Sequence, residues 1–373
     1  MKIGFEAKRV YHNTTGLGNY GRDLLRSLAR LYPQNYYFLY HPKKRQSPLF
    51  TIDAPCVVEK LPSTNFYKKF KNYWRQKGIV TDLVKDDIHL FHGLSGELPS
   101  GLKKRNIKSV VTIHDLIFIR YPSLYSFFDR KIHFYKFKKA ANNADIIIAI
   151  SEQTKQDVIE FLKVDAHKIK VIYQSCHQAF KEHYSEKEKE IVRSKHGLPD
   201  QFLLNVGTLE ERKNAFSIVK AIKDVDMTLV LIGRETAYSD RIKTYIDAHH
   251  LSDKIIFLSH ITIKELAVIY QLATLFIYPS IFEGFGIPII EALYAKTPVI
   301  TTKSGVFPEA GGPNSVYIDP TNVEELKEKI LLLMGNESLR NDISEKGYTF
   351  VQKFSEAQQA DRMMQVYTDL LEG

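Results

Sequence analysis

The chain has 373 residues, of which 44% are hydrophobic and 25% charged, a composition typical of a globular protein with two domains. No apolar run approaches the roughly 18 residues that a membrane-spanning helix requires, and Glu6 follows the N-terminus too closely for a secretory signal, so we expect neither segment. The two cysteines, Cys56 and Cys176, have no metal-binding or redox spacing, which indicates a reducing compartment and a cytoplasmic location.

The net charge of +9 is distributed unevenly along the chain. Residues 1–180 carry 30 Lys and Arg against 15 Asp and Glu, whereas residues 181–373 carry 22 against 28. The basic half is suited to an anionic surface or an acidic acceptor. A nucleic acid is the rival partner, but no zinc-finger or helix-turn-helix motif supports it, so we expect no nucleic-acid binding.

Short β-branched runs alternate with amphipathic segments throughout the chain, which predicts parallel sheets covered by helices. In the first half, the predicted strands are 3–5, 36–40, 89–91, 110–113, 146–150 and 170–172. After a polar, charge-rich stretch, the pattern resumes with predicted strands at 202–206, 228–232, 255–258, 275–278, 299–301 and 316–318. We therefore predict an α/β protein with two doubly wound domains.

The predicted domain bounds follow from this pattern. They are an N-terminal domain at 1–176, a linker region at 177–200, a C-terminal domain at 201–353 and an amphipathic helix at 354–373. Doubly wound units bind ligands at the carboxyl ends of their strands, so we expect the site in a cleft between the two domains.

A glycine-rich segment follows the first strand and opens a helix. Gly16 and Gly18 leave room for the backbone to cradle a phosphate, and Asn19 and Tyr20 come directly after them. A tight turn between strand and helix is the alternative interpretation.

The predicted strand at 110–113 ends in a histidine and an acid, His114 and Asp115. The side chains at a strand end can reach a ligand, although a buried imidazole that satisfies a loop carbonyl is the alternative.

Two cations, Arg212 and Lys213, follow the first strand of the second half and its Gly207. Such a pair suits a diphosphate, because Arg binds in a fork and Lys acts as a point charge. A solvated basic helix start is the alternative, although the positive end of a helix normally disfavours bases.

Residues 276–292 contain two carboxylates, Glu283 and Glu291, on either side of a glycine-rich turn that enters an apolar helix. Gly284 and Gly286 allow close approach of the backbone, and unpaired N–H groups at a helix start attract anions. We expect Glu291 about two turns inside the helix, where a buried acid needs a partner such as a ribose hydroxyl pair. An ordinary strand-turn-helix with two surface glutamates is the alternative.

The stretch Pro-Ser-x-x-Glu-Gly-Phe-Gly-x-Pro-x-x-Glu-Ala within residues 276–292 resembles the Glu-x7-Glu signature of retaining glycosyltransferases of family 4. The segments around Gly16, His114 and Arg212 resemble further motifs of that family in the same order, and Arg120-Tyr121-Pro122 matches its mannosyltransferase-like members. The resemblance implies the GT-B fold, with two Rossmann-like domains and a C-terminal helix that crosses back onto the first domain.

The resemblance also implies the reaction. A sugar would move from a nucleotide diphosphate donor, GDP-mannose or a UDP-sugar, to a glycan or lipid-linked acceptor of a surface polysaccharide, with retention and without a metal or other cofactor. It places the catalytic residues at His114, Glu283, Arg212 and Lys213, the donor-binding residues at Gly16, Gly18, Gly207, Gly284, Phe285, Gly286 and Glu291, and the acceptor-binding residues at Asn19, Tyr20 and Asp115. Another GT-B enzyme, such as a nucleotide-sugar epimerase, and a non-catalytic partner subunit are the alternatives.

Two basic-aromatic stretches, 66–77 and 127–139, lie in the basic half. In the first, Phe66, Phe70, Tyr73 and Trp74 share one predicted helical face. Such helices can rest on an anionic membrane surface, which would place the protein peripherally on the inner face of the cell membrane. Aromatic core residues with a solvated lysine face are the alternative.

Overall fold

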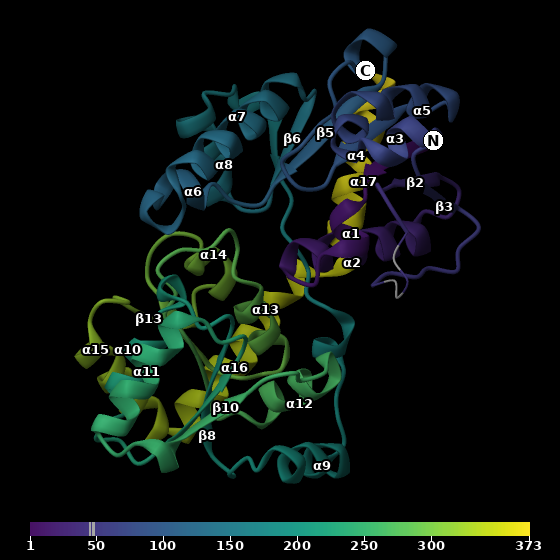
Figure 1. The fold of residues 1–373 in the computed structure, drawn as a ribbon. Coiled ribbons are helices and arrows are strands. Elements are labelled where there is room, and N and C mark those ends of the chain that lie inside the picture. Colours follow the sequence, from purple (N-terminus) through teal and green to yellow (C-terminus); the bar gives the residue numbers. More distant parts are fainter. Residues whose placement is uncertain (45, 47–48) are drawn as a thin grey trace. The chain divides into compact units, whose positions relative to one another are not determined.

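A computed structural model describes residues 1–44, 46 and 49–373. The chain forms two compact units (Figure 1). Unit 1 comprises Met1–Gln174 together with Glu356–Gly373, and unit 2 comprises Ser175–Ser355. Each unit has its own parallel sheet and its own apolar core.

The sheet of unit 1 has seven strands among the described residues, in the order β3-β2-β1-β4-β5-β6-β7, and all neighbours pair in parallel. The strands are β1 (Lys2–Glu6), β2 (Tyr36–Tyr40), β3 (Val57–Lys60), β4 (Leu90–Gly93), β5 (Lys108–Ile113), β6 (Ile146–Ala149) and β7 (Ile169–Val171). The sequence prediction located all of these strands except the edge strand β3.

The helices of unit 1 are α1 (Lys8–His12), α2 (Gly16–Leu31), α3 (Asn65–Lys69), α4 (Lys71–Tyr73), α5 (Ile79–Lys85), α6 (Ile117–Arg120), α7 (Phe127–Asn143), α8 (Glu152–Leu162) and α17 (Glu356–Glu372). A π-helical turn spans Trp74–Gly78. The C-terminal helix α17 packs on α2, because Met363, Met364 and Tyr367 are buried in the same cluster as Leu24 and Leu28.

The predicted aromatic face at residues 66–77 is wrong at Trp74. The chain leaves the helical conformation at Phe70, between α3 and α4, so residues 66–74 are not one continuous helix, and Trp74 begins a π-helical turn. Trp74 is fully buried, and its Nε1 donates a hydrogen bond to Oδ2 of Asp82 at 2.7 Å. Phe66 and Tyr73, by contrast, are half exposed.

The sheet of unit 2 has six parallel strands among the described residues, in the order β10-β9-β8-β11-β12-β13. The strands are β8 (Phe202–Val206), β9 (Thr228–Ile232), β10 (Ile255–Leu258), β11 (Leu275–Tyr278), β12 (Val299–Thr302) and β13 (Val316–Ile318). The order of both sheets changes direction beside the first strand of the unit, as in doubly wound folds. The predicted α/β fold with two parallel sheets is thus confirmed.

The helices of unit 2 are α9 (Glu186–His196), α10 (Ala215–Ala221), α11 (Ala237–Ala248), α12 (Ile263–Leu272), α13 (Ile287–Tyr294), α14 (Phe307–Gly311), α15 (Val323–Met334) and α16 (Glu337–Val351). Helix α9 lies within the predicted linker region, residues 177–200. It begins with a capping box at Ser185 and Glu188 and packs on α12. Within the described residues, no helix combines the length and the apolar character needed to cross a membrane.

Candidate active site

The glycine-rich loop of unit 1 leads directly into helix α2. The side chain of Asn13 accepts hydrogen bonds from the N–H groups of Thr15 and Gly18 at 2.9 and 3.1 Å, which fixes the loop. Any Cβ at Gly18 would lie 2.1 Å from the carbonyl oxygen of Asn13, so only glycine fits there. A Cβ at Gly16 would meet no atom within 4 Å, which leaves that side of the loop open.

The two residues after Gly18 have internal partners. Oδ1 of Asn19 accepts a hydrogen bond from Arg22 at 2.5 Å. Tyr20 is buried, and its hydroxyl lies 3.2 Å from Oγ1 of Thr112 on β5. Tyr20 therefore does not have the exposed position expected of an acceptor contact. Instead, its ring meets the ring of His114 edge-on, with 4.6 Å between centroids.

His114 follows β5 and is buried, and its Nε2 lies 2.9 Å from the carbonyl oxygen of Leu94. Burial lowers the pKa of His114 to about 4, although the bond to Leu94 opposes the shift. The imidazole is therefore neutral at neutral pH. A carbonyl can only accept, so Nε2 carries the proton and Nδ1 is left as a hydrogen-bond acceptor.

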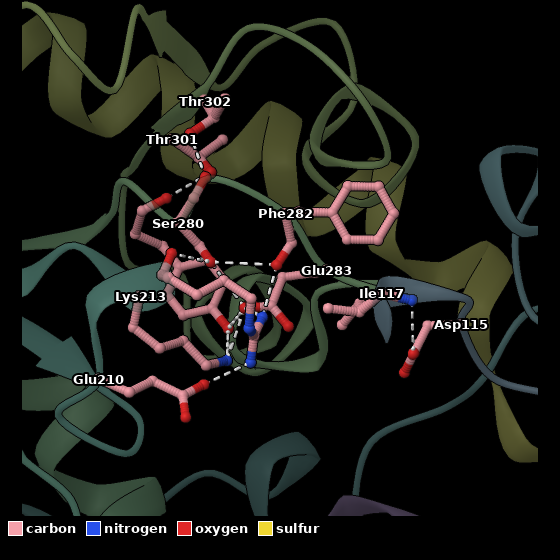
Figure 2. Close-up of polar contacts among 11 residues, drawn as sticks. Asp115, Ile117, Glu210, Lys213, Ser280, Phe282, Glu283, Thr301 and Thr302 are labelled. Carbon is pink, nitrogen blue, oxygen red and sulfur yellow. Dashed lines mark hydrogen bonds and ion pairs between the residues drawn. The ribbon is translucent and has the colours of Figure 1, made fainter. Parts of the chain in front are cut away.

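His114 lines a cavity of about 190 Å³ within unit 1. The lining also includes Leu17, between the two loop glycines, and Arg9, which follows β1. Asp115 lines the same cavity, and its Oδ1 accepts a hydrogen bond from the N–H group of Ile117 at 3.1 Å (Figure 2). The structure thus brings together the glycine-rich loop and the histidine motif, which are about 100 residues apart in the sequence.

In unit 2, Arg212 and Lys213 lie in a single 3-10 turn, Glu211–Lys213, between β8 and α10. Gly207, at the end of β8, lies close to them, since a Cβ there would be 3.6 Å from Cδ of Lys213. Asn214 ends the turn in a left-handed conformation, with φ of 56°. Both cations are therefore held at the carboxyl edge of the sheet, where α/β folds bind ligands.

Glu283 contacts both of these cations, and Figure 2 shows it beside Lys213. Its Oε1 is 2.7 Å from an Arg212 nitrogen and 2.6 Å from Nζ of Lys213. The hydroxyls of Tyr278 and Ser280 also donate to Oε1, at 3.0 and 2.7 Å. Burial raises the pKa of the Glu283 carboxyl, but the charges of Lys213 and Arg212 and their hydrogen bonds outweigh burial and lower it to about 2.

Arg212 has further contacts that hold it in place. It donates to the carbonyl oxygen of Phe282 at 2.5 Å and to Oε1 of Glu210 at 2.6 Å. Burial lowers the pKa of Arg212, but the charge of Glu283 more than compensates and raises it. Arg212 and Glu283 are therefore both ionised, and the carboxylate contacts both Arg212 and Lys213.

The loop that carries Glu283 is held by hydroxyl groups from strand β12. Oγ1 of Thr301 donates to the carbonyl oxygen of Tyr278 at 2.8 Å, and Oγ1 of Thr302 donates to that of Ser280 at 2.7 Å. All four of these side chains are buried. The backbone that leads into Glu283 is therefore held at two points, Tyr278 and Ser280.

Helix α13 begins at Ile287 with Pro288 in its first turn. Gly286 precedes it with φ of 112°, a conformation that only glycine adopts readily. Phe285 is a core residue whose ring packs edge-on against Phe354, with 5.3 Å between centroids. Gly284 lies in the bend between Glu283 and Phe285.

Glu291 lies one turn inside α13, not the two turns expected from the sequence, because the helix starts only at Ile287. Its Oε2 accepts a hydrogen bond at 3.0 Å from the hydroxyl of Tyr270 on α12. It is partly exposed. The hydroxyl of Tyr270 thus contacts Glu291, while that of Tyr278 contacts Glu283.

Several residues of the site could not be assigned from the sequence pattern. Tyr278 and Ser280 contact Glu283, Tyr270 contacts Glu291, and Arg9 lines the His114 cavity. Arg9 carried a weak signal, because a base soon after the first strand lies at the carboxyl edge of the sheet. Within the described part of the chain, no three His, Cys, Asp or Glu side chains gather in a way that could hold a metal ion.

Two family descriptions match consecutive parts of the chain. Residues 14–175 match "Glycosyltransferase Family 4", and residues 186–350 match "Glycosyl transferases group 1". An uncharacterized glycosyltransferase of Methanocaldococcus jannaschii is 30% identical over 310 residues, which cover 82% of this chain and 80% of that protein.

Two Escherichia coli proteins are similar as well. The serotype-specific mannosyltransferase WbdA is 26% identical over 329 residues, 82% of this chain, but the match spans only 40% of WbdA. O-antigen chain mannosyltransferase B is 24% identical over 383 residues, with 95% of this chain and 96% of that protein covered.

Solved structures share the fold over nearly the whole chain. Sucrose-phosphate synthase of Thermosynechococcus elongatus superposes with a TM-score of 0.82 at 21% identity, covering 100% of this chain and 99% of the other. HepE of Anabaena, in complex with UDP-glucose, superposes with a TM-score of 0.71 at 17% identity, covering 99% and 100%. From the matched motifs, the two family matches and this fold, the chain belongs to glycosyltransferase family 4 and has the GT-B fold.

Proposed function

We propose that this chain is a retaining glycosyltransferase that moves a sugar from a nucleotide diphosphate donor to a hydroxyl of a glycan or lipid-linked acceptor. The observation that carries the proposal is the cluster of Arg212, Lys213 and Glu283 at the carboxyl edge of the unit 2 sheet. A family 4 chain with this cluster has the groups needed to stabilise a departing diphosphate.

The two cations act on the bond that breaks. Negative charge grows on the diphosphate as the bond to the sugar lengthens, and Arg212 and Lys213 lie where backbone and carboxylate contacts hold them in position. Glu283 orients both cations and, as an ionised acceptor, can also bind sugar hydroxyls. The start of α13, with Gly284, Phe285 and Gly286 before it, adds the positive end of a helix dipole.

Other residues of the site bind the ribose and the sugar of the donor, and the acceptor. Glu291, aligned by Tyr270, accepts hydrogen bonds from the ribose hydroxyls. His114 is neutral, so it binds a sugar hydroxyl through Nδ1 instead of contributing a positive charge. Arg9 and Asp115 line the same cavity and bind acceptor or sugar hydroxyls there.

The relatives support a choice of donor and pathway. WbdA and O-antigen chain mannosyltransferase B are named as mannosyltransferases, which favours GDP-mannose and a surface polysaccharide acceptor. HepE binds UDP-glucose in the same fold, which keeps UDP-sugars among the donors to be tested.

The experiment is a thermal-shift and turnover screen of GDP-mannose, UDP-glucose and related nucleotide sugars. A donor at 100 times its Kd should stabilise the fold by about 2.7 kcal/mol. The Glu291→Ala variant should lose this stabilisation and turnover. Glu345→Ala, which removes an exposed glutamate paired with Lys296 on the same unit, is the matched control and should keep both.

The same screen separates the alternative functions. An epimerase would convert the nucleotide sugar without any acceptor, so incubation with the donor alone distinguishes it from a transferase. A non-catalytic subunit would show neither conversion nor transfer, and the complete Arg212, Lys213 and Glu283 cluster argues against it. If Glu291→Ala bound and consumed the donor like the wild type, the assignment of this site would be wrong.

Peripheral binding to an anionic membrane is the second part of the proposal, and unit 1 has a surface suited to it. Phe66, Phe70 and Tyr73 of α3 and α4 are about half exposed. Helix α7 exposes Phe127, Phe128, Ile132 and Tyr135, with Lys131, Lys136 and Lys139 beside them. Gln76 lines the same cavity of about 350 Å³ as Ile132 and Tyr135, so the two aromatic segments adjoin.

Exposed aromatic side chains among lysines match the interface of an anionic bilayer, where rings enter the headgroup region and ammonium groups bind phosphates. Flotation with phosphatidylserine vesicles at low salt tests this. Phe66→Ser with Phe70→Ser should reduce binding. Tyr36→Ser, which removes a similarly exposed aromatic at the start of β2, should not. Equal flotation with neutral and anionic vesicles would contradict the proposal.

A further inference from the structure

Tyr367 connects the C-terminal helix α17 to the interior of unit 1 by a hydrogen bond. Its side chain is fully buried, and its hydroxyl lies 2.6 Å from Nδ1 of His92 on β4. Of its neighbours on α17, Met363 packs in the apolar core, and Sδ of Met364 accepts a hydrogen bond from the side-chain amide of Asn35 at 3.7 Å. A phenylalanine could fill this position with the same ring, so the buried hydroxyl is explained only by its partner.

The hydrogen-bonded chain continues beyond His92. Its Nε2 lies 2.8 Å from Oγ1 of Thr112, and that oxygen lies 3.2 Å from the hydroxyl of Tyr20. Burial, with a smaller contribution from His114, lowers the pKa of His92 to about 3, so its ring is neutral and one nitrogen donates while the other accepts. Both nitrogens of His92 are therefore paired, in a chain that runs from α17 to α2.

The last residue of this hydrogen-bonded series, Tyr20, lies against His114 of the candidate active site. The ring of Tyr20 meets the ring of His114 edge-on, at an interplanar angle of 90°. On its other side, His114 is held by the carbonyl group of Leu94. These two contacts fix the plane of the imidazole, and hence the direction of Nδ1, so a displaced Tyr20 would leave His114 with one restraint instead of two.

We propose that Tyr367 is a positioning residue for His114, acting through His92, Thr112 and Tyr20. This inference rests on the proposed role of His114 in binding the sugar. The C-terminal helix follows unit 2 in the chain but belongs to unit 1. Helix α17 therefore contributes to the apolar core and, when correctly packed, also keeps His114 in its orientation.

The proposal can be tested with substitutions that remove the hydrogen bonds one at a time and together. Tyr367→Phe and Thr112→Val each remove one hydroxyl from this series of hydrogen bonds and nearly keep the side-chain volume. Tyr32→Phe is the matched control, because the Tyr32 hydroxyl also bonds α17, through Asp361 at 2.8 Å, but lies on the surface and has no link to His114. Thr112→Ser keeps the hydroxyl and should retain activity.

We expect Tyr367→Phe and Thr112→Val each to lower kcat at least about tenfold, with little change in the KM for the donor. The kcat of the double variant should be no lower than that of the more impaired single variant, because both substitutions interrupt the same series of hydrogen bonds. Tyr32→Phe should keep the wild-type kcat. Thermal midpoints measured in parallel separate a loss of folding from a loss of positioning.

Imidazole nitrogen NMR shifts give a readout that does not depend on turnover. The His114 signals should move in Tyr367→Phe and in Thr112→Val and stay unchanged in Tyr32→Phe. Unchanged His114 signals, additive losses in the double variant or an equal effect of Tyr32→Phe would each overturn the proposal. A wild-type protein that transfers no sugar would refute the proposed function instead, and the NMR comparison would still decide the link from Tyr367 to His114.

Discussion

A single carboxylate oxygen, Oε1 of Glu283, organises the charged part of the candidate site. It accepts contacts from Arg212, Lys213, Tyr278 and Ser280 at 2.6–3.0 Å. An ion pair with low exposure offsets the cost of desolvation only when its geometry is good and its remaining groups are hydrogen-bonded. Oε1 of Glu283 has four such contacts, so the carboxylate holds two cations near each other despite their repulsion.

We predict that Glu283→Gln destabilises unit 2 by about 3 kcal/mol, because two cations whose side chains are only 15% exposed lose their counter-charge. Transfer activity should fall at least about 100-fold, since the cations lose their fixed positions. Glu210→Gln is the control. Its partner is also Arg212, but its side chain is 39% exposed, so the loss should stay below about 1 kcal/mol. Urea unfolding and donor turnover measure both effects, and equal losses in the two variants would contradict the prediction.

Sequence reasoning assigned Arg212, Lys213 and Glu283 to one donor site but did not predict the direct contacts between them. The pair and the carboxylate are about 70 residues apart, and their contact depends on β8 lying beside β11 in the sheet. The same limit applies to Tyr20, which was expected to face an acceptor. Its burial follows from the pairing of β4 with β5, which places Thr112 within reach of its hydroxyl.

At the scale of elements, the turn from Glu283 into α13 depends on one glycine. Gly286 has φ of 112°, and a Cβ there would meet Ala310 at 3.4 Å, which is ordinary contact. The obstacle to a side chain is therefore the backbone conformation and not a lack of space. Residue 286 therefore requires glycine because of its backbone conformation. Residue 18 requires glycine for a different reason, since a Cβ there would collide with a carbonyl group.

We predict that Gly286→Ala destabilises the protein by about 1–2 kcal/mol through backbone strain and weakens donor binding, because α13 would begin differently. Gly101→Ala is the matched control. Gly101 has a similar φ of 104° and no atom within 4 Å of its Cβ position, and it lies in a loop of unit 1. Both variants should lose similar stability in thermal unfolding. Only Gly286→Ala should raise the Kd for the donor, and an unchanged Kd would refute this role of the turn.

The elements that sequence reasoning located well are those with strong β-branched patterns, such as the buried strands β9 and β12 of unit 2. Strand β3 was missed because it is a four-residue edge strand whose last two residues are Glu59 and Lys60. Trp74 was assigned to the wrong face because helical spacing assumes an uninterrupted helix. The bend at Phe70 interrupts that spacing, and it has no signal in the sequence pattern.

At the scale of the whole molecule, the two units carry different kinds of acid-sensitive groups. In unit 1, burial lowers the pKa of His92 to about 3 and that of His114 to about 4, from an ordinary value of 6.5. In unit 2, the cations lower the pKa of Glu283 to about 2 from 4.5, against the effect of burial. Because each pKa is lowered in the folded protein, the folded state loses stability when the pH falls below the ordinary pKa of the group. The ordinary pKa values of histidine and glutamate differ by 2 pH units.

The sign of each effect follows from proton uptake. Between pH 6.5 and about 4, unfolded unit 1 binds protons at His92 and His114 that the folded unit does not, so its stability falls with acid. Glu283 has the same effect on unit 2, but only between pH 4.5 and about 2. The histidines therefore act on unit 1 in a pH range where Glu283 is ionised in both the folded and the unfolded chain.

We predict that lowering the pH from 7 to 5 destabilises unit 1 by up to about 2 kcal/mol for each of these histidines, while Glu283 keeps its contribution to unit 2. Trp74, the single tryptophan, is buried in unit 1, so its fluorescence during thermal unfolding reports on that unit alone. Amide exchange of strands β8 to β13 reports on unit 2. The Trp74 midpoint should fall between pH 7 and 5 more than the protection of unit 2, and His114→Gln should reduce that fall. Parallel losses in the two units, unaffected by His114→Gln, would show that the buried histidines do not set the acid stability of unit 1.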